Sequence, residues 1–293
     1  MKITLRQIQV FAHVARYESV SKAADALALS QSATSMALSE LESNLEKELF
    51  HRAGKRLKLN DFGRQLQPQC QQLLDLATLI EHSASNAPIQ GHLRIGASST
   101  IGNYVLPELI ASFSASYPDI HIDLAVANTE QILHQMLHLQ IDIAFIEGSN
   151  QHTQLQATDW STDELVIFTS PKIADHLGPE PTTNTLINLP WVLREPGSGT
   201  REVFQQALGT AQNELHVKLE LGNSEAIKQA VKAGMGLSCL SRRVVANEFF
   251  LSELIEVRTK RLNLTRQFYS VYLRNKKPGV LAQAFLDHST HFV

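Results

Sequence analysis

The sequence predicts a two-domain chain of mixed class, with a small, mainly helical α+β domain followed by a larger α/β domain. Its 293 residues are too many for one small core. Before about residue 90, apolar residues recur at helical spacing. From His92 onward, short β-rich runs alternate with amphipathic helical segments. The change falls at residues 87–91, so we expect a first domain at 1–60, a connecting helix at 61–90 and a second domain at 91–293.

The composition excludes several classes of protein. It is 43% hydrophobic and 19% charged, as in ordinary globular proteins, and holds no apolar run long enough to span a bilayer. No apolar signal core opens the chain, and Cys70 and Cys239 lie far apart, which favours a reducing compartment. We therefore expect a cytoplasmic protein without membrane contact. A net charge of −3 argues against coating nucleic acid, so DNA contact requires a local basic patch.

Three short helices are expected first. Apolar residues repeat at helical spacing over 5–15 and again over 20–27, on either side of a serine-flanked break. A third helix begins near Ser30, a residue type that caps free backbone N–H groups. Its inward stripe is expected to consist of Thr34, Leu38, Leu41 and Leu45, and its opposite face is polar, with Gln31, Ser32, Ser35 and Ser39.

A basic hairpin follows these helices. Residues 49–59 alternate like two short strands around a turn that contains Gly54. Positive charge gathers here, against the single nearby acid Asp61, on Arg52, Lys55, Arg56, Lys58 and Arg64. The hairpin is therefore the wing of a winged helix-turn-helix and supplies the local basic patch.

A long helix is expected from Asn60, which can cap it, to about Ser85. Its apolar residues follow alternating steps of three and four, interrupted by Gln69: Phe62, Leu66, Leu73, Leu76 and Ile80. This stripe predicts pairing with the same helix of a second subunit. The alternative is packing on its own domain, because such stripes also occur in helix pairs within one chain.

Three helices and a basic hairpin suit binding in the major groove of double-stranded DNA. The polar face of the third helix would reach base edges while the wing pairs with phosphates. The candidate DNA-binding residues are Ser30, Gln31, Ser32, Thr34, Ser35, Arg52, Lys55 and Arg56. The alternative is that the serines only cap a helix and that the hairpin is a solvated surface.

The second domain shows strand-like runs separated mostly by helical patterns. These runs lie at 93–95, 120–126, 141–146, 165–169, 191–194, 217–221, 237–240 and 268–273. The alternation predicts mainly parallel sheets with helices on both faces.

Two stretches of this domain have the chemistry of anion sites. Residues 97–103 follow a strand and open a helix with Ser98, Ser99 and Thr100, where hydroxyls and free N–H groups converge. Residues 194–201 form a Gly-rich strand-to-helix turn whose backbone can hold an anion. Plain helix capping is the alternative for either stretch alone. Two of them favour a ligand cleft.

Four segments resemble, in order and spacing, the DNA-binding domain of LysR-type transcription regulators: residues 5–15, 19–27, 29–33 and 49–52. The resemblance covers the whole chain. It implies a linker helix that mediates dimerisation, a dimer or tetramer, and a periplasmic-binding-protein-like regulatory domain of two α/β lobes. The lobes would be residues 91–162 with 266–293, and 163–265, joined by two crossing strands. Two positions depart from the pattern: Asn60-Asp61 replaces a common Thr-Pro pair, and Met36 stands where arginine is frequent.

Residues 95–107, 197–201 and 221–228 resemble most the YeiE branch of this family, near its CysB and CbbR regulators. That branch is associated with sulfite sensing, which implies sulfite as the leading effector. Another small anion or a carboxylate metabolite is the alternative. The candidate ligand-binding residues are Ser98, Ser99, Thr100, Asn128, Glu147, Gly199 and Thr200.

Glu147 ends a predicted strand, where open α/β sheets bind ligands. A carboxylate repels an anion unless a proton lies between them. We therefore expect Glu147 to accept a hydrogen bond from a protonated ligand, or to be protonated itself, and so to select bisulfite-like species over sulfate. The alternative is that Glu147 pairs with a nearby arginine or lysine.

Other classes fit the sequence less well. An enzyme would need a nucleophile set, metal triad or cofactor loop, none of which is recognisable. An exported solute-binding protein would need a signal segment and would not need residues 1–60. We expect no cofactor and no metal, since His134 and His138, one helical turn apart, fit a solvated helix face better than a metal site.

Overall fold

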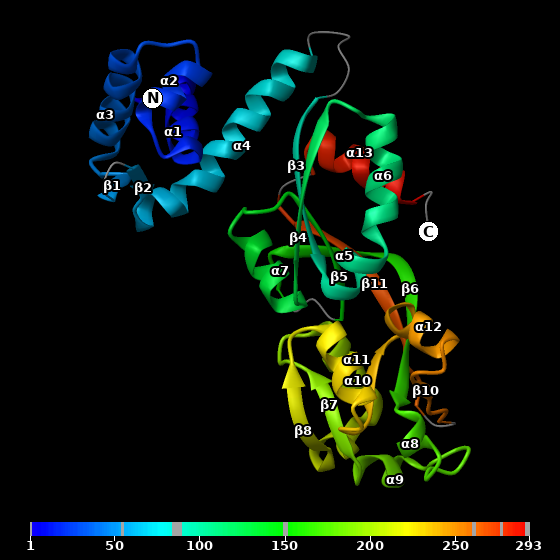
Figure 1. The fold of residues 1–293 in the computed structure, drawn as a ribbon. Helices are drawn as coiled ribbons and strands as arrows, with labels where there is room; N and C mark the ends of the chain where they lie inside the picture. Colours follow the sequence, from blue (N-terminus) through cyan, green and yellow to red (C-terminus); the bar gives the residue numbers. More distant parts are fainter. Residues whose placement is uncertain are drawn as a thin grey trace. The chain divides into compact units, whose positions relative to one another are not determined.

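The computed structural model describes residues 2–53, 56–83, 90–148, 152–259, 262–275 and 278–290. It divides into two compact units, Met1–His92 with His138–Gln140, and Leu93–Leu137 with Ile141–Val293. We call them the N-terminal unit and the C-terminal unit (Figure 1). The predicted change of domain at 87–89 lies outside the described residues.

The N-terminal unit contains the three predicted helices, the hairpin and the long helix. They are α1 (Leu5–Tyr17), α2 (Val20–Ala26), α3 (Gln31–Leu45), β1 (Phe50–Ala53), β2 (Arg56–Leu59) and α4 (Asp61–Ser83). Side-chain oxygens cap the helix starts: Ser19 accepts from the backbone N–H of Lys22, and Ser30 from that of Ala33. Asn60 Oδ1 accepts from the N–H of Gly63 at 2.8 Å. The predicted caps at Ser30 and Asn60 are therefore confirmed.

The core of this unit lies between α1, α3 and the hairpin. The rings of Phe11 and Phe50 meet with their centroids 5.6 Å apart, beside buried Leu41 and Leu49. The start of α4 packs on this core through Phe62 and Leu66. Farther along the same helix, Leu73 and Leu76 are 46% and 54% exposed. The stripe on α4 therefore divides into an inner part that packs within the unit and an outer part in which Leu73 and Leu76 are about half exposed.

Strands of the C-terminal unit form one sheet of seven strands and one of two. The larger has the order β10-β6-β11-β5-β3-β4, with β9 also paired to β6, and the smaller joins β7 to β8. Their bounds are β3 (Gly91–Ser98), β4 (Ile120–Ala127), β5 (Ile143–Glu147), β6 (Leu155–Thr169), β7 (Pro190–Arg194), β8 (His216–Leu221), β9 (Ser238–Ser241), β10 (Ile255–Glu256) and β11 (Thr265–Leu273).

The larger sheet is mixed, so the expectation of mainly parallel pairing was wrong. Parallel registers join β3 to β5 and β7 to β8, and an isolated parallel bridge joins Trp191 to Leu237. The long strand β6 runs antiparallel to β11 over residues 155–164 and then antiparallel to β9 over residues 165–168. β6 therefore contributes antiparallel pairs to both groups of strands, whereas β-α-β crossovers alone give parallel pairs.

Because β6 changes partners in its middle, the C-terminal unit has two lobes (Figure 1). The first lobe holds β3, β4 and β5 with α5 (Ser99–Tyr104), α6 (Leu106–Ser116), α7 (Thr129–Leu137) and α13 (Val280–Thr290). The second holds β7 to β10 with α8 (Pro171–Ala174), α9 (Thr183–Ile187), α10 (Gly199–Leu208), the 3-10 helix Gly209–Glu214, α11 (Ser224–Lys232) and α12 (Arg242–Phe250).

Each lobe has its own apolar core. In the first lobe, the ring of Phe285 lies 5.0 Å from that of Phe113 and 5.9 Å from that of Phe145. In the second, Trp191 packs against Phe204 with centroids 4.9 Å apart. Polar residues gather instead where β3, β5 and β7 end, at Ser98, Glu147 and Arg194.

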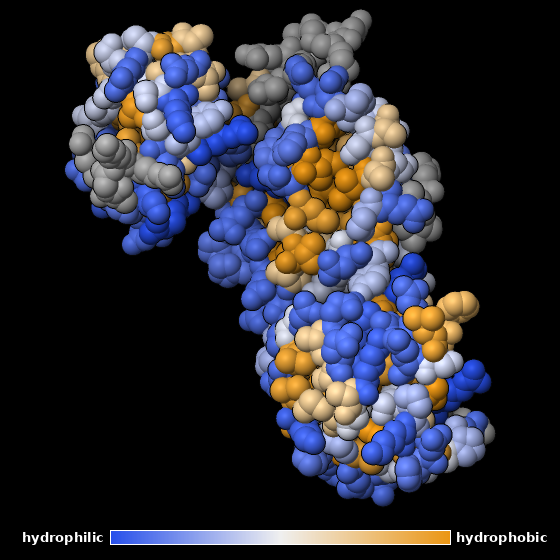
Figure 2. Space-filling view, viewed as in Figure 1, coloured by the Kyte–Doolittle hydropathy of each residue, from blue (hydrophilic) through white to orange (hydrophobic). Residues whose placement is uncertain are grey.

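The face drawn in Figure 2 is largely hydrophilic, with apolar side chains in smaller groups. Among the residues that the structure describes, no helix combines the length and the apolar character needed to cross a membrane.

Candidate functional site

Three hydroxyl groups from both lobes converge on the carboxylate of Glu147. Ser98 Oγ, at the end of β3, donates to Oε2 at 2.9 Å. Thr100 Oγ1 from α5 and Thr200 Oγ1 from α10 donate to Oε1 at 3.2 and 3.1 Å. A β-strand end and two helix starts therefore bind one oxyanion, which belongs to the protein itself.

A buried arginine completes this group. The guanidinium of Arg266, at the start of β11, lies 3.7 Å from Glu147 Oε1. Its Nη1 and Nη2 also donate to the hydroxyl oxygens of Thr200 and Thr100, at 2.9 and 3.1 Å. On its other side Arg266 pairs with Asp163 of β6, with Nη2 2.7 Å from Oδ2. We call these six residues the Glu147 site: Ser98, Thr100, Glu147, Asp163, Thr200 and Arg266.

The Glu147 site is closed to solvent and balanced in formal charge. The side chains of Glu147 and Arg266 are only 2% and 1% exposed. Two carboxylates, Glu147 and Asp163, face Arg266 and the half-exposed Arg243, whose Nε lies 3.5 Å from Asp163 Oδ1. In the structure Glu147 thus pairs with an arginine, Arg266, which is the alternative that the sequence left open. A further anion added to this site would leave an excess negative charge unless a proton accompanied it.

Gly199 allows the two lobes to meet at this point. A Cβ built on Gly199 would stand 1.9 Å from the carbonyl oxygen of Glu147. No larger residue fits there without movement. Beside it, Thr129 Oγ1 donates to the same carbonyl at 2.8 Å, and the N–H of Glu130 donates to the carbonyl of Gly197 at 3.2 Å. Tyr104 adds a more exposed contact between lobes by donating to Glu225 at 2.8 Å.

A second polar group adjoins the Glu147 site and centres on Arg194, at the end of β7. Its Nε and Nη2 donate to the two carboxylate oxygens of Glu195, at 2.8 and 2.9 Å. Nη2 also reaches Ser99 Oγ of the first lobe at 3.2 Å, and Asn128 Nδ2 donates to Glu195 Oε1 at 3.2 Å. Burial raises the pKa of the Glu195 carboxyl, but the hydrogen bonds and charge of Arg194 outweigh it and hold that pKa below its ordinary value. We call Arg194 and Glu195 the Arg194 pair.

The structure places all seven predicted ligand residues in these two neighbouring groups. Ser98, Thr100, Glu147 and Thr200 meet in the Glu147 site, with Gly199 against its backbone. Ser99 and Asn128 contact the Arg194 pair. Sequence reasoning missed Asp163 and Arg266, which lie on strands paired antiparallel. In the sequence, an acid and an arginine more than 100 residues apart give no signal that they will meet.

A cavity of about 530 Å³ lies beside the Glu147 site, between α7 and α10. Its walls include Thr129, Ser198, Arg201, Glu130 and Glu202. Arg201 is already paired with Glu220 at 2.6 Å and with the carbonyl of Arg194 at 3.0 Å. With two carboxylates facing one paired guanidinium, this cavity suits a small anion less well than the hydroxyl groups around Glu147 do.

The N-terminal unit presents the predicted polar face on α3. Ser30, Gln31, Ser32 and Ser35 are exposed. Thr34 is fully buried, and its hydroxyl donates to the carbonyl of Ser30 at 3.0 Å. Its inclusion among the DNA-contacting residues was therefore wrong, because the side chain faces the core of the helical domain. Lys55 and the side chains of Arg52 and Arg56 lie outside what the structure describes.

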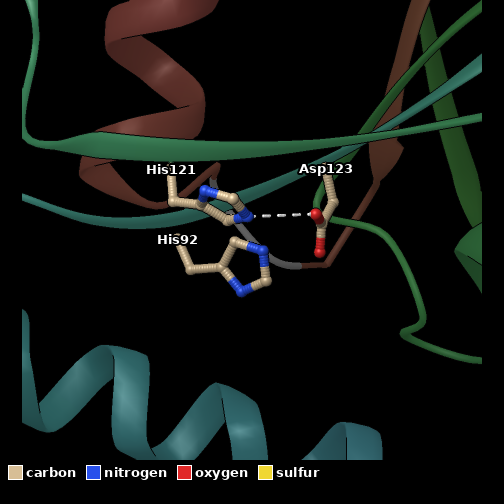
Figure 3. A group of neighbouring side chains, drawn as sticks. All are labelled: His92, His121 and Asp123. Carbon is tan, nitrogen blue, oxygen red and sulfur yellow. Dashed lines mark ion pairs between the residues drawn. The ribbon is translucent and has the colours of Figure 1, made fainter.

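The cysteines and the histidines His134 and His138 are the other candidates that the sequence offered. Cys70 and Cys239 are buried as free thiols, and burial raises the pKa of the Cys70 thiol to about 11. His134 and His138 are exposed. Figure 3 shows His121 and Asp123, also exposed, forming an ion pair at 3.3 Å. His92, drawn with them, is part of the N-terminal unit, and no shared site is inferred.

Comparison with known proteins identifies the family. Residues 86–292 match the LysR substrate binding domain, and residues 5–64 match the bacterial regulatory helix-turn-helix protein of the lysR family. The transcriptional regulator YeiE of Escherichia coli strain K12 is 43% identical over 288 residues, which are 98% of this chain and 97% of that one.

Two solved structures share the fold. The regulatory domain of CcmR from Synechocystis PCC6803, in complex with 2-PG, is 31% identical, with a TM-score of 0.64 over 69% of this chain and 97% of that one. Full-length CbnR, complexed with its target DNA, is 18% identical, with a TM-score of 0.67 over 99% of this chain and 100% of that one. The chain therefore belongs to the LysR family of bacterial transcription regulators: it is a ligand-responsive DNA-binding protein, not an enzyme.

Proposed function

We propose that this regulator senses a small oxyanion at the Glu147 site, with sulfite as the leading candidate. One observation carries the proposal: three hydroxyl donors from two lobes, with a buried guanidinium beside them, already bind the oxyanion that Glu147 provides. An effector oxygen would take over these donors. Preorganised hydroxyl and guanidinium donors of this kind favour oxyanions over neutral or cationic molecules.

The formal charges favour an effector that arrives with a proton. The groups facing Glu147 are Arg266, its partner Asp163 and, behind that, Arg243. Together with Glu147 itself their charges cancel, so a bare dianion would add an uncompensated charge in a buried place. Either Glu147 or the effector would hold the extra proton, which would select bisulfite-like species over sulfate.

Two relatives bear on the proposed effector, YeiE and the regulatory domain of CcmR. Over nearly its full length the chain is 43% identical to YeiE of Escherichia coli, and the resemblance of its sequence to that branch is the reason for naming sulfite first. The CcmR regulatory domain, solved in complex with 2-PG, supports ligand binding by a domain of this kind. A different small anion or a carboxylate metabolite is the second candidate, and the same donors would bind it.

For DNA binding we propose that α3 and the wing make different contacts. Ser30, Gln31, Ser32 and Ser35 would contact base edges and phosphates, and Arg52, Lys55 and Arg56 would contact phosphates. The exposure of the α3 residues supports the first half of this proposal. The outer stripe of α4 would pair two subunits into a homodimer, and two such dimers would form a homotetramer.

The mechanism that we propose is a shift between two arrangements of the lobes. The effector would bind one arrangement more tightly and so increase its population. In the dimer or tetramer, the new lobe angle would alter the spacing of the DNA-binding units on double-stranded promoter DNA.

The variant Glu147→Gln tests this proposal. It keeps the shape of the side chain but removes the negative charge, so sulfate should gain affinity relative to sulfite. Calorimetric titration of wild type and variant with both anions measures the ratio of dissociation constants. We expect that ratio to change about tenfold or more, which corresponds to about 1.4 kcal/mol. An unchanged ratio with intact sulfite binding would refute the role of Glu147, and no sulfite binding to wild type would refute sulfite as effector.

A further inference from the structure

Within the described part of the chain, the Arg194 pair contains a buried cationic donor without a hydrogen-bond partner. The Arg194 side chain is 1% exposed, yet its Nη1 has no hydrogen-bond partner among the described residues. Buried polar groups are nearly always hydrogen-bonded, and those of a charged group most of all. A guanidinium nitrogen left without a partner by the described residues therefore marks a position where a further acceptor would be favourable.

This donor lies next to the proposed effector position. Arg194 extends from β7 of the second lobe to Ser99 Oγ of the first. Ser99 stands between Ser98 and Thr100, whose hydroxyls donate to Glu147. The Cα atoms of consecutive residues are about 3.8 Å apart. The segment Ser98–Thr100 therefore brings the Arg194 pair and the Glu147 site close to each other.

The chemistry of Nη1 specifies the class of its partner. A guanidinium donates hydrogen bonds and accepts none, and its planar nitrogens fit the oxygens of carboxylate, phosphate and similar anions. The carboxylate of Glu195 accepts hydrogen bonds from Nε and Nη2, on one side of the planar guanidinium. The remaining Nη1 side can therefore serve an oxygen of a second anion but no cationic group.

We propose that Arg194 is an effector-binding residue, whose Nη1 donates to an oxyanion oxygen of the ligand held between the lobes. The inference rests on the proposed function and adds to it a cation of the second lobe. It also assigns Glu195 a role: its carboxylate orients the guanidinium and offsets part of its charge. Effector binding would then join β7 of one lobe to the Ser98–Thr100 segment of the other.

Binding and structural roles predict different results for two charge variants. With Arg194→Gln, the donor is lost and Glu195 is left as an uncompensated negative charge, so anion affinity should fall about tenfold or more. With Glu195→Gln, the positive charge of Arg194 is no longer offset, so anion affinity should rise severalfold. A purely structural pair would weaken folding in both variants and change affinity in the same direction, or not at all.

A matched control exists on the same strand as Ser98. Arg94, near the start of β3, forms a similar two-point pair with Asp142, at 3.1 and 2.7 Å. The variants Arg94→Gln and Asp142→Asn break that pair without touching either polar group of the lobe junction. They should lower the melting temperature and leave anion affinity unchanged. Arg194→Lys, which keeps the charge on a different shape, serves as a second variant if Arg194→Gln fails to fold.

The experiment is calorimetric titration of the full chain with sulfite, sulfate and phosphate separately, for wild type and these variants. Opposite shifts in Arg194→Gln and Glu195→Gln, against unchanged controls, would support the inference. Wild-type affinity in Arg194→Gln would overturn it and leave sulfite sensing intact. If wild type binds phosphate and not sulfite, the sulfite proposal fails and the phosphate series decides the role of Arg194. If wild type and Glu195→Gln bind none of the anions, both proposals fail.

Discussion

At the scale of single residues, the lack of a side chain at Gly199 allows the two lobes to approach each other at the site. The backbone of α10 comes so close to the end of β5 that a Cβ on Gly199 would lie 1.9 Å from the carbonyl oxygen of Glu147. This approach places Thr200, the next residue, within 3.1 Å of the Glu147 carboxylate. The donor from the second lobe reaches the first lobe because its neighbour is glycine.

Gly199→Ala should therefore separate the lobes. The added methyl group cannot be accommodated without moving α10, and overpacking of this kind costs about 1–3 kcal/mol. We expect a lower melting temperature and sulfite affinity reduced at least about tenfold, measured by thermal unfolding and calorimetry. Gly178→Ala is the control, because a Cβ there meets no atom within 4 Å. Equal effects of the two substitutions would contradict the importance of the close approach.

The residues of the site differ in how far the sequence predicted them. Ser98, Thr100 and Thr200 were predictable because a hydroxyl at a strand-to-helix turn has a known local chemistry. Arg266 and Asp163 were not. Each is an ordinary charged residue in its own segment, and only the antiparallel register of β6 and β11 brings Arg266 opposite Asp163. The prediction for Thr34 was wrong for a different reason. Its hydroxyl group suggested DNA contact, but its position on the inward stripe of α3 already indicated a buried side chain.

At the scale of elements, periodicity predicted most strands and helices, but of β6, one of the two crossing strands that the resemblance implied, it predicted only the apolar end. The predicted run at 165–169 is the apolar end of β6, whereas its first part, Gln156–Glu164, is polar and often exposed. A strand whose partners cover it only in part needs no continuous apolar face, so it resembles a loop in sequence. Without that strand, mainly parallel sheets were the natural expectation. With it, the sheet is mixed.

The element that the proposed assembly depends on is α4. Its inner stripe is covered by the N-terminal core, and Leu73 and Leu76 remain about half exposed. Leu76→Glu would place a charge in the proposed seam of each subunit, so we expect dissociation to monomers in analytical ultracentrifugation. Gln67→Glu, at an exposed position off the stripe, is the control and should leave assembly unchanged. A dimer of normal stability in Leu76→Glu would place the interface elsewhere.

At the scale of the whole molecule, a bacterial LysR regulator acts on DNA in the cytoplasm and responds to a ligand. The Glu147 site draws residues from both lobes, and the Arg194 pair of the second lobe contacts Ser99 of the first. An effector bound at the proposed site would contact both lobes at once, so its binding energy would depend on the angle between them. That dependence is the differential affinity that a population shift requires.

The most direct test of this account is the melting temperature of the full chain against millimolar sulfite, with sulfate, thiosulfate and phosphate as comparisons. At one hundred times its dissociation constant, a ligand stabilises the folded state by about 2.7 kcal/mol, which gives a clear shift. We predict that sulfite raises the melting temperature of wild type, and that Thr100→Val combined with Thr200→Val, which keeps the shape and removes two donors, abolishes the rise. An equal rise in the double variant, or none in wild type with any of these anions, would contradict oxyanion sensing at the Glu147 site.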